Sequence, residues 1–429
     1  MSNERNRYYG YPISEETIAL AKRAEQDCLI QFEKIEENAM LASAKVLEAF
    51  QACRVCSSDF IDITGYGYSD PGRDKLEAIY ARVFDAEDAL VRPQLMSGTH
   101  ALAVTLDGLL KAGDVLVYIS GEPYDTLRSV IGTSGNSRNS LIKRGLKYEE
   151  IDLVDDDFDI EAIKARISKG DVKVAAIQRS RGYSRRKSIT LEKIERAIKA
   201  VKEACPQTLV MVDNCYGEFT ESREPTAIGA DVFVGSMMKN LGAGFATSGA
   251  YCVGTKEAIA DIAERFSAPC IGKDLGANFN QLSAYYKGLF MAPAAVAATL
   301  KSMVFAARML ELCGFDGISP AYDEERTDIV QTVDFGCAEK LIKFCTGIQK
   351  GSPVEAFATP YPSEMPGYPH LEVSAAGTFV TGATNELSCD GPLVEPFTAY
   401  MQGGLTYEYG KLGIMRAVDE MMDRGQSDF

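Results

Sequence analysis

The stretch DVFVGSMMKNLGAG, residues 231–244, decides the fold and also raises the question of function. Its first half is a short apolar run that predicts a buried strand, and its glycine-rich second half predicts a turn. Lys239 stands in that turn, where it is neither on the charged face of a helix nor at a helix cap. The chain therefore carries an amine out of a buried strand, and the surrounding sequence has to explain why.

Six further apolar runs have the same character, and they occupy residues 89–96, 114–120, 146–153, 172–178, 209–213 and 249–254. Helical patterns fill most of the gaps between them, notably residues 99–111, 159–168 and 190–204. Buried runs that alternate with helices predict a mostly parallel sheet of seven strands with helices on both faces. No helix separates the last two runs, so one of them is expected to pair antiparallel.

The segments that precede and follow this α/β region have a different sequence pattern. Ser14, followed by two glutamates, predicts a helix start, and the helical pattern of residues 17–53 is long enough that a break is expected. Beyond about residue 275 a long helical stretch leads into mixed short strands and helices. We predict an N-terminal helical arm (residues 1–65), a large domain (66–285) and a smaller C-terminal α+β domain (286–429).

The composition excludes several classes of function. The 429 residues carry a net charge of −16, which argues against a nucleic-acid partner because such partners need clustered Lys and Arg. With only His100 and His370, a Ser-His-Asp triad or a histidine-rich metal centre is hard to build. The single CxxC, Cys53–Cys56, has no second pair at zinc-site spacing, so no metal site is predicted.

The expected compartment follows from cysteines and hydropathy. Eleven scattered cysteines, an odd number, favour reduced thiols in the cytoplasm over a disulfide framework. The polar N-terminus MSNERNRYYG and the lack of a run of about 18 apolar residues predict neither a signal peptide nor a membrane span. We therefore expect a cytoplasmic protein without a membrane anchor.

Polar residues collect where the predicted strands end. In open parallel sheets, ligands bind outside the carboxyl ends of the strands. The residues that follow the apolar runs there are Gly98, Thr99, Tyr124, Asp213, Ser236 and Lys239. Each alone has an ordinary structural explanation as a turn, a helix cap or a surface charge. Together they place an anion-binding helix start, an aromatic ring, a carboxylate and an amine at one sheet edge.

This combination suits pyridoxal 5′-phosphate (PLP), a flat, phosphorylated heterocycle with an aldehyde. Lys239 would form the Schiff base, and Asp213 would keep the ring nitrogen protonated so that the ring accepts electrons. Tyr124 would stack on the ring and could pass a proton. The phosphate would be bound by the backbone of Gly98 and Thr99 and by the hydroxyl of Ser236.

At these residues the sequence resembles the fold-type I PLP enzymes, and within them the lyases of cysteine and methionine metabolism. It is most similar to the bacterial aluminium-resistance or methionine γ-lyase family proteins, in the segments GYGYSDPGRDKLEAIYARVF, RPQLMSGTHAL, VDNCYGEF, GSMMKNLGAG and YMQGGLTYEY. The resemblance implies the same roles for Lys239, Asp213 and Tyr124. It also implies that Tyr66 or Tyr68, with Arg73, completes the phosphate site of a neighbouring subunit in a homodimer or homotetramer.

Two departures from the lyase pattern concern the substrate side. The lyases hold the substrate carboxylate with a C-terminal arginine, but beyond residue 330 only Arg416 and Arg424 remain. Where the lyases have an asparagine near the cofactor hydroxyl, this chain reads QRSRGY, so Ser180 or a neighbouring arginine, Arg179 or Arg181, would take that place. One of these two arginines is also the candidate for the missing carboxylate contact.

The leading hypothesis is a PLP-dependent carbon–sulfur lyase that acts on a sulfur-containing L-amino acid, similar to cystathionine β-lyase or methionine γ-lyase. Its products would be a thiol, ammonia and a 2-oxo acid. Another fold-type I enzyme, such as an aminotransferase, would share every cofactor residue, because the fold does not fix the reaction. A third hypothesis is a non-catalytic protein of the same fold with a role in aluminium tolerance.

Overall fold

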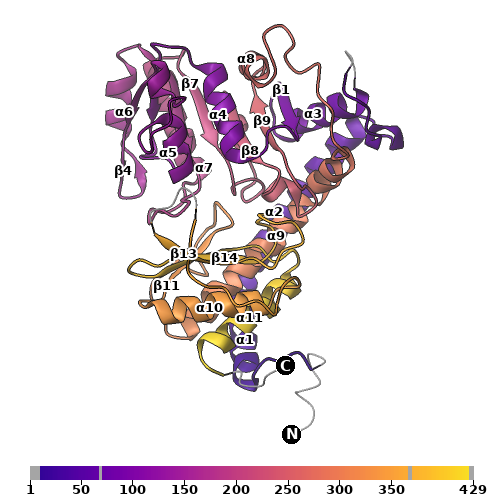
Figure 1. Ribbon diagram of the computed structural model, residues 1–429, viewed down its shortest axis with the longest axis vertical. Helices are drawn as coiled ribbons and strands as arrows, with labels where there is room; N and C mark the ends of the chain where they lie inside the picture. The colour runs from indigo at the N-terminus through magenta and orange to yellow at the C-terminus, as the bar shows by residue number, and fades with distance from the viewer. Residues whose placement is uncertain (1–9, 67–69, 366–369, 425–429) are drawn as a thin grey trace. The chain divides into compact units, whose positions relative to one another are not determined.

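The computed structural model describes residues 10–66, 70–365 and 370–424, and Figure 1 traces its elements. The chain separates into two compact units, one of Met1–Ala39 with Ala294–Phe429 and one of Met40–Pro293. Two long helices, α2 (Leu29–Ala52) and α9 (Leu282–Leu312), contribute residues to both units. The first helical residues thus belong to the same unit as the C-terminal part of the chain.

The unit of residues 40–293 is built on a seven-stranded sheet in the order β1-β9-β8-β7-β6-β2-β3. Its strands are β1 (Asp88–Arg92), β2 (Val115–Tyr118), β3 (Lys147–Glu150), β6 (Val172–Gln178), β7 (Leu209–Asp213), β8 (Val232–Ser236) and β9 (Ala250–Gly254). β9 pairs antiparallel with both β1 and β8, whereas β8, β7, β6, β2 and β3 pair in parallel. The predicted sheet and its single antiparallel strand are confirmed.

Helices cover both faces of this sheet, as predicted. They are α3 (Pro71–Val83), α4 (Gly98–Leu109), α5 (Asp125–Ile131), α6 (Ile160–Ile167), α7 (Leu191–Ala204) and α8 (Lys256–Phe266), and a small hairpin, β4 (Leu153–Val154) with β5 (Asp157–Phe158), precedes α6. On one face, Leu102 and Leu106 of α4 and Ile259 of α8 share a buried core with Met211 and Val234 of the sheet. This α4 face is the one that matters for the site.

The opposite face near β8 and β9 is aromatic. Tyr80 and Phe84, at the end of α3, pack their rings against Tyr251 of β9, with centroids 5.5 and 6.3 Å apart. Phe84 also meets the ring of Phe233 on β8 edge-on at 5.3 Å. Successive side chains of a strand point to opposite faces. Phe233 and Tyr251 therefore point away from the α4 face, toward which their neighbours in sequence are directed.

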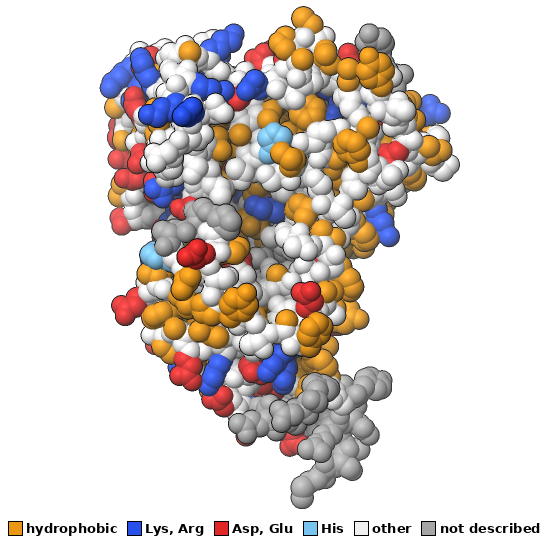
Figure 2. Space-filling model, in the orientation of Figure 1, with side chains coloured by type: hydrophobic (Ala, Val, Ile, Leu, Met, Phe, Trp, Pro, Cys, Tyr) orange, Lys and Arg blue, Asp and Glu red, His pale blue; other side chains and the backbone are white. Residues whose placement is uncertain are grey.

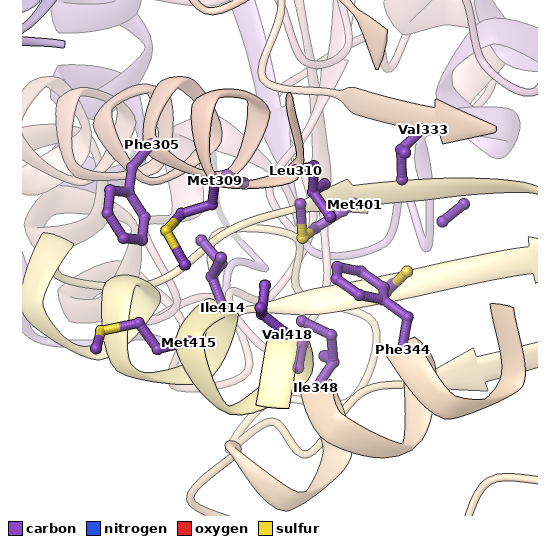
Figure 3. Close-up of a cluster of buried hydrophobic side chains, with 14 of the residues drawn as sticks. Phe305, Met309, Leu310, Val333, Phe344, Ile348, Met401, Ile414, Met415 and Val418 are labelled. Atoms are coloured by element: carbon purple, nitrogen blue, oxygen red, sulfur yellow. The ribbon is translucent and has the colours of Figure 1, made fainter. Parts of the chain in front are cut away.

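The other unit is an α+β assembly around an antiparallel sheet, which agrees with the predicted smaller C-terminal domain. The strand order is β10-β11-β15-β14-β13-β12, with β10 (Ile318–Ser319), β11 (Gln331–Asp334), β12 (Ser363–Glu364), β13 (Leu371–Ala375), β14 (Ser388–Pro392) and β15 (Thr398–Gln402). Helices α10 (Ala338–Lys350) and α11 (Tyr407–Met421) complete it. Figure 3 shows its core, where Phe305 of α9 and Phe344 of α10 lie among side chains of β11, β15 and α11.

The N-terminal helices begin and break where the sequence predicts. Ser14 caps α1 (Glu15–Asp27) by accepting a hydrogen bond from the backbone N–H of Thr17 at 3.1 Å. Cys28 then separates α1 from α2, so the long helical pattern is interrupted. Asp419 of α11 accepts from the backbone N–H and hydroxyl of Ser14, both at 2.7 Å, and from the hydroxyl of Thr17 at 2.5 Å. These three bonds hold the start of α1 to its unit.

Within the described residues one helix, α9, is long and apolar enough to cross a membrane by length and composition alone. About two thirds of its apolar window, 67%, is buried inside the protein. A core helix of a globular protein passes the same test, because both need a long apolar surface.

Candidate active site

Three polar residues at the carboxyl ends of adjacent strands point to the α4 face. Met211 and Val234 belong to the core on that face, so Asp213 and Ser236, two residues further along the same strands, point the same way. Gln178 ends β6 with the same alternation. The start of α4 lies directly beside them. A Cβ built on Gly98 would lie 3.5 Å from the Cβ of Ser236.

The turn that follows β8 presents Lys239. The hydroxyl of Ser236 accepts a hydrogen bond from the backbone N–H of Met238 at 3.1 Å, and its carbonyl accepts from that of Lys239 at 3.2 Å. A Cβ on Gly242 would collide with the carbonyl oxygen of Met237, so the tight turn requires glycine there. Gly244 has a φ of +78°, in the left-handed region that favours glycine. The glycines around the lysine are thus explained by the sharpness of the turn.

Lys239 is partly buried, and its ammonium lies over an aromatic ring. Its Nζ is 3.7 Å from the ring centroid of Tyr216. Burial disfavours the charged amine, but the neighbouring acidic groups of Cys215, Tyr216 and Asp213 outweigh it and raise the pKa of Lys239. Without another cation nearby, the lysine therefore holds its proton firmly.

Asp213 is a buried carboxyl whose environment fits a cationic partner. Burial raises the pKa of Asp213, and Lys239 and the backbone N–H of Cys215, which donates to Oδ1 at 3.1 Å, offset only part of that effect. A carboxylate in this position gains from an additional positive charge on the α4 face. The protonated ring nitrogen of PLP is such a charge, so the site fits that group here.

The anion-binding end of the site is the first turn of α4. The hydroxyl of Ser97 accepts from the backbone N–H of His100 at 3.1 Å, and its carbonyl accepts from that of Ala101 at 3.0 Å. The N–H groups of Gly98 and Thr99 have no hydrogen-bond partner among the described residues. Free N–H groups at a helix start bind phosphate well. With Ser236 alongside, the predicted phosphate residues are brought together.

Tyr124 reaches the same place from the start of α5. Its hydroxyl shares a hydrogen bond of 2.8 Å with the hydroxyl of Thr99, and its backbone N–H donates to Oε1 of Gln178 at 2.8 Å. Burial, with the charge of Asp213 as a smaller contribution, raises the pKa of Tyr124. The phenol therefore stays neutral, as a stacking ring and proton donor requires. The structure places Tyr124 beside Thr99, in agreement with the predicted grouping.

The segment QRSRGY after β6 forms hydrogen bonds mainly to other groups of its own chain. Ser180 is buried, and its carbonyl accepts from Nε2 of Gln178 at 2.9 Å and from Nη2 of Arg186 at 2.8 Å. Arg179 is fully buried and donates to Oδ1 of Asn214 and to Oε1 of Glu221, both at 2.7 Å. Its guanidinium thus braces the loop after β7, and a contact of Arg179 or Arg181 with the substrate carboxylate stays a prediction.

The predicted tyrosine loop contributes differently from the other site residues. Tyr66 is 86% exposed and forms an isolated antiparallel bridge with Leu275, and Tyr68 lies outside the described residues. Arg73 is buried in its own chain, where Nη2 donates to the carbonyl of Asp274 at 3.2 Å. Arg73 is thus held within its own chain here, and its predicted role at a neighbouring subunit stays a prediction. The ring of Tyr66 remains accessible to a partner.

Sequence reasoning missed two residues of the site, Tyr216 and Gln178. Gln178 ends β6 just as Asp213 ends β7, so the strand-end rule that found Asp213 would also have found Gln178. Tyr216 adopts a φ of +73°, which turns it back beneath Lys239, and no periodic pattern reveals such a turn. In the described part of the chain, no group of three or more His, Cys, Asp or Glu side chains could hold a metal ion.

Comparisons with known proteins identify the family of the chain. The family model described as methionine gamma-lyase matches residues 17–422. The uncharacterized protein YnbB of Bacillus subtilis is 45% identical over 406 residues, which cover 94% of this chain and 96% of that protein. A carbon-sulfur lyase involved in aluminum resistance from Clostridium novyi has a TM-score of 0.93 and 39% identity, over 97% of this chain and 99% of that chain.

A more distant structure bears on the fold alone. The pyridoxal-5'-phosphate dependent protein YhfS from Escherichia coli has a TM-score of 0.61 and 18% identity, over 91% of this chain and 97% of that chain. This likeness confirms the predicted fold class, a PLP-type α/β domain with a smaller α+β domain.

Proposed function

Because the chain belongs to the methionine gamma-lyase family, we propose that it is a PLP-dependent carbon–sulfur lyase acting on a sulfur-containing L-amino acid. The observation that carries this proposal is the convergence of Lys239, Asp213 and the free start of α4 at one sheet edge. The relative from Clostridium novyi, described as a carbon-sulfur lyase, supports the reaction class. The substrate class corresponds to cystathionine or methionine, with a thiol, ammonia and a 2-oxo acid as products.

Each residue of the site has a separate task in this proposal. PLP, when bound, supplies an electron sink for the charge that develops at the substrate Cα. Lys239 would hold the cofactor through its amine and, as a free amine, would be the base that takes the Cα proton of the substrate. Asp213 maintains the positive charge at the ring nitrogen. Gly98, Thr99 and Ser236 bind the phosphate, and Tyr124 covers the ring and shields it from water.

The sheet-containing unit offers a surface for a second copy of the chain. Besides Tyr66, it exposes apolar side chains at Met40 (71%), Ile61 (64%) and Phe279 (64%), and contiguous apolar patches are typical of protein–protein interfaces. Hydrophobic side chains also gather on the upper right of the face in Figure 2, over the region of α3. We therefore include in the proposal a homodimer or homotetramer in which Tyr66 or Tyr68 completes a neighbouring site. We also propose that the protein is cytoplasmic and that Ser180 lies near the cofactor hydroxyl.

The decisive experiment replaces the amine. The purified full chain with PLP is screened against cystathionine, methionine, cysteine and homocysteine, and thiol and 2-oxo acid are measured together. Lys239→Ala is expected to lose the visible absorbance of bound cofactor and all thiol release. Lys199→Ala, in the exposed part of α7, is the matched control and should retain both. Retention of both properties by Lys239→Ala contradicts the proposal.

The same screen separates the alternatives. An aminotransferase consumes the substrate only with an added 2-oxo acid acceptor, whereas the lyase releases ammonia without one. A role in aluminium tolerance without catalysis predicts no thiol from any of the four substrates and heat of binding on titration with a trivalent metal ion.

A further inference from the structure

Glu218 is a buried acid next to the lysine turn to which the proposed mechanism gives no task. It lies in the loop after β7, and its exposed fraction is 0%. The hydroxyl of Tyr251 donates a short hydrogen bond to its Oε1, while its Oε2 is buried with no hydrogen-bond partner among the described residues. A buried carboxylate with an unpaired oxygen is costly, so this arrangement calls for an explanation.

The side chain of Glu218 fills the space beneath the end of β8. Gly235 pairs with Tyr251 across the antiparallel strands, and a Cβ on Gly235 would collide with the Tyr251 hydroxyl and lie 2.5 Å from Oε1 of Glu218. The absence of a side chain at Gly235 is therefore what admits the acid and the phenol. The carboxyl supports the strand end from the face opposite to Asp213.

The backbone of Glu218 contacts the other end of the same turn. Its carbonyl accepts a hydrogen bond from Nδ2 of Asn240 at 2.9 Å, and Asn240 is the residue that follows Lys239. Asn240 is itself fully buried. Glu218 thus contacts the turn on both sides of Lys239, at Gly235 before the lysine and at Asn240 after it.

The charge of Glu218 depends on the groups that face it from each neighbouring element. Burial is the largest influence and raises the pKa of Glu218 to about 8, against the Tyr251 hydrogen bond, which lowers it. Glu224 on the same loop raises it further, and Lys239 lowers it. Tyr80 from α3 and Cys215 also interact electrostatically with the acid, and burial raises the pKa of both groups. Burial therefore favours the neutral carboxyl at neutral pH, and alkaline solution favours its ionisation.

We propose that Glu218 is a positioning residue for Lys239: it fixes the turn between Gly235 and Asn240, and the charge state of its carboxyl acts on the amine held by that turn. This inference rests on the proposed function, in which Lys239 is the reactive amine. A negative charge favours the ammonium form, so ionisation of Glu218 makes Lys239 less nucleophilic. Glu218 then limits the rise in reactivity that alkaline pH would otherwise bring.

The test measures the nucleophilicity of Lys239 directly in the cofactor-free full chain. Acetylation of Lys239 by dilute acetic anhydride is followed by mass spectrometry at about pH 6 and about pH 10, two units on either side of the Glu218 transition. Glu218→Gln keeps the shape and the acceptor for Tyr251 but cannot ionise. We expect equal rates in wild type and variant at the lower pH. At the higher pH the variant should react on the order of threefold to tenfold faster, the effect of removing one poorly screened charge.

Two further variants secure the interpretation. Tyr251→Phe removes the hydrogen bond that lowers the pKa of Glu218, so it should accelerate acetylation of Lys239 at the higher pH in the same direction as Glu218→Gln. It decides the question if Glu218→Gln proves to be misfolded. Tyr285→Phe removes another buried phenol, one that donates to the carbonyl of Ser248, and should match wild type.

Identical pH profiles in wild type and Glu218→Gln overturn the inference, and so does an equal change at both pH values, which indicates a structural effect alone. Failure of the proposed function is distinguishable, because it shows as a wild-type chain that does not bind PLP, whereas the acetylation profile needs no cofactor.

Discussion

The contact between Lys239 and Tyr216 leads to a quantitative prediction about cofactor capture. Nζ lies 3.7 Å from the ring centroid in a partly buried place. A cation held over a ring contributes about 1–2 kcal/mol in such surroundings. Since one pKa unit corresponds to about 1.4 kcal/mol, loss of the ring should lower the pKa of Lys239 by about one unit. The free amine, which attacks the cofactor aldehyde, then appears at lower pH.

Tyr216→Leu and Tyr216→Phe form the matched pair for this prediction. Both replacements share the φ of +73° at this position, so the backbone strain is similar, and only phenylalanine keeps the ring. The cofactor-free chain is mixed with PLP across a pH series, and capture is followed by visible absorbance. We expect the pH of half-maximal capture to fall by about one unit in the leucine variant and to stay near wild type in the phenylalanine variant. Equal midpoints in all three proteins would refute the reasoning.

Four other substitutions separate chemistry from stability. Asp213→Asn keeps the shape of the side chain and should leave the melting temperature unchanged. Its kcat/KM should fall about a thousandfold, because an opposite charge at about 4 Å contributes about 4 kcal/mol. A loss of kcat/KM under tenfold contradicts the assigned role. Gly235→Ala should cost about 1–3 kcal/mol in urea unfolding through overpacking, because its Cβ would collide with the Tyr251 hydroxyl. Gly98→Ala, whose Cβ would meet the Sγ of Cys215 at 3.3 Å, should cost less. Asp419→Ala removes three hydrogen bonds to the start of α1 and should cost about 3 kcal/mol, and an unchanged unfolding midpoint would show that these bonds add nothing.

The sheet and much of its functional edge were predictable because the information is local. Runs of apolar β-branched residues mark buried strands, and the residue that follows such a run reaches the carboxyl edge whatever the rest of the chain does. Asp213, Ser236 and Lys239 were found in this way. The antiparallel β9 followed from a missing helix, since the residues between β8 and β9 show no helical pattern that could form a crossover.

The remaining features depend on contacts between residues that are distant in sequence or on irregular backbone. Asp419 bonds to Ser14 across 405 positions, and no periodicity connects them. The loop after β7 has positive φ at Tyr216 (+73°) and Phe219 (+61°), so the direction of its side chains does not follow from alternation. Glu218 lies between these two residues. Its burial against β9 could be recognised only from the folded chain.

The antiparallel pairing of β8 and β9 links the chemistry of the lysine to the acid behind it. A parallel strand after β8 would need a crossover, usually through an α-helix, whereas antiparallel pairing lets the chain return through the loop that holds Lys239. The same register sets Tyr251 opposite Gly235, where its hydroxyl reaches Glu218. A slip of one residue would move Tyr251 to the α4 face and leave Glu218 without its donor. One strand pairing therefore both exposes the amine on one face of the sheet and supports it from the other.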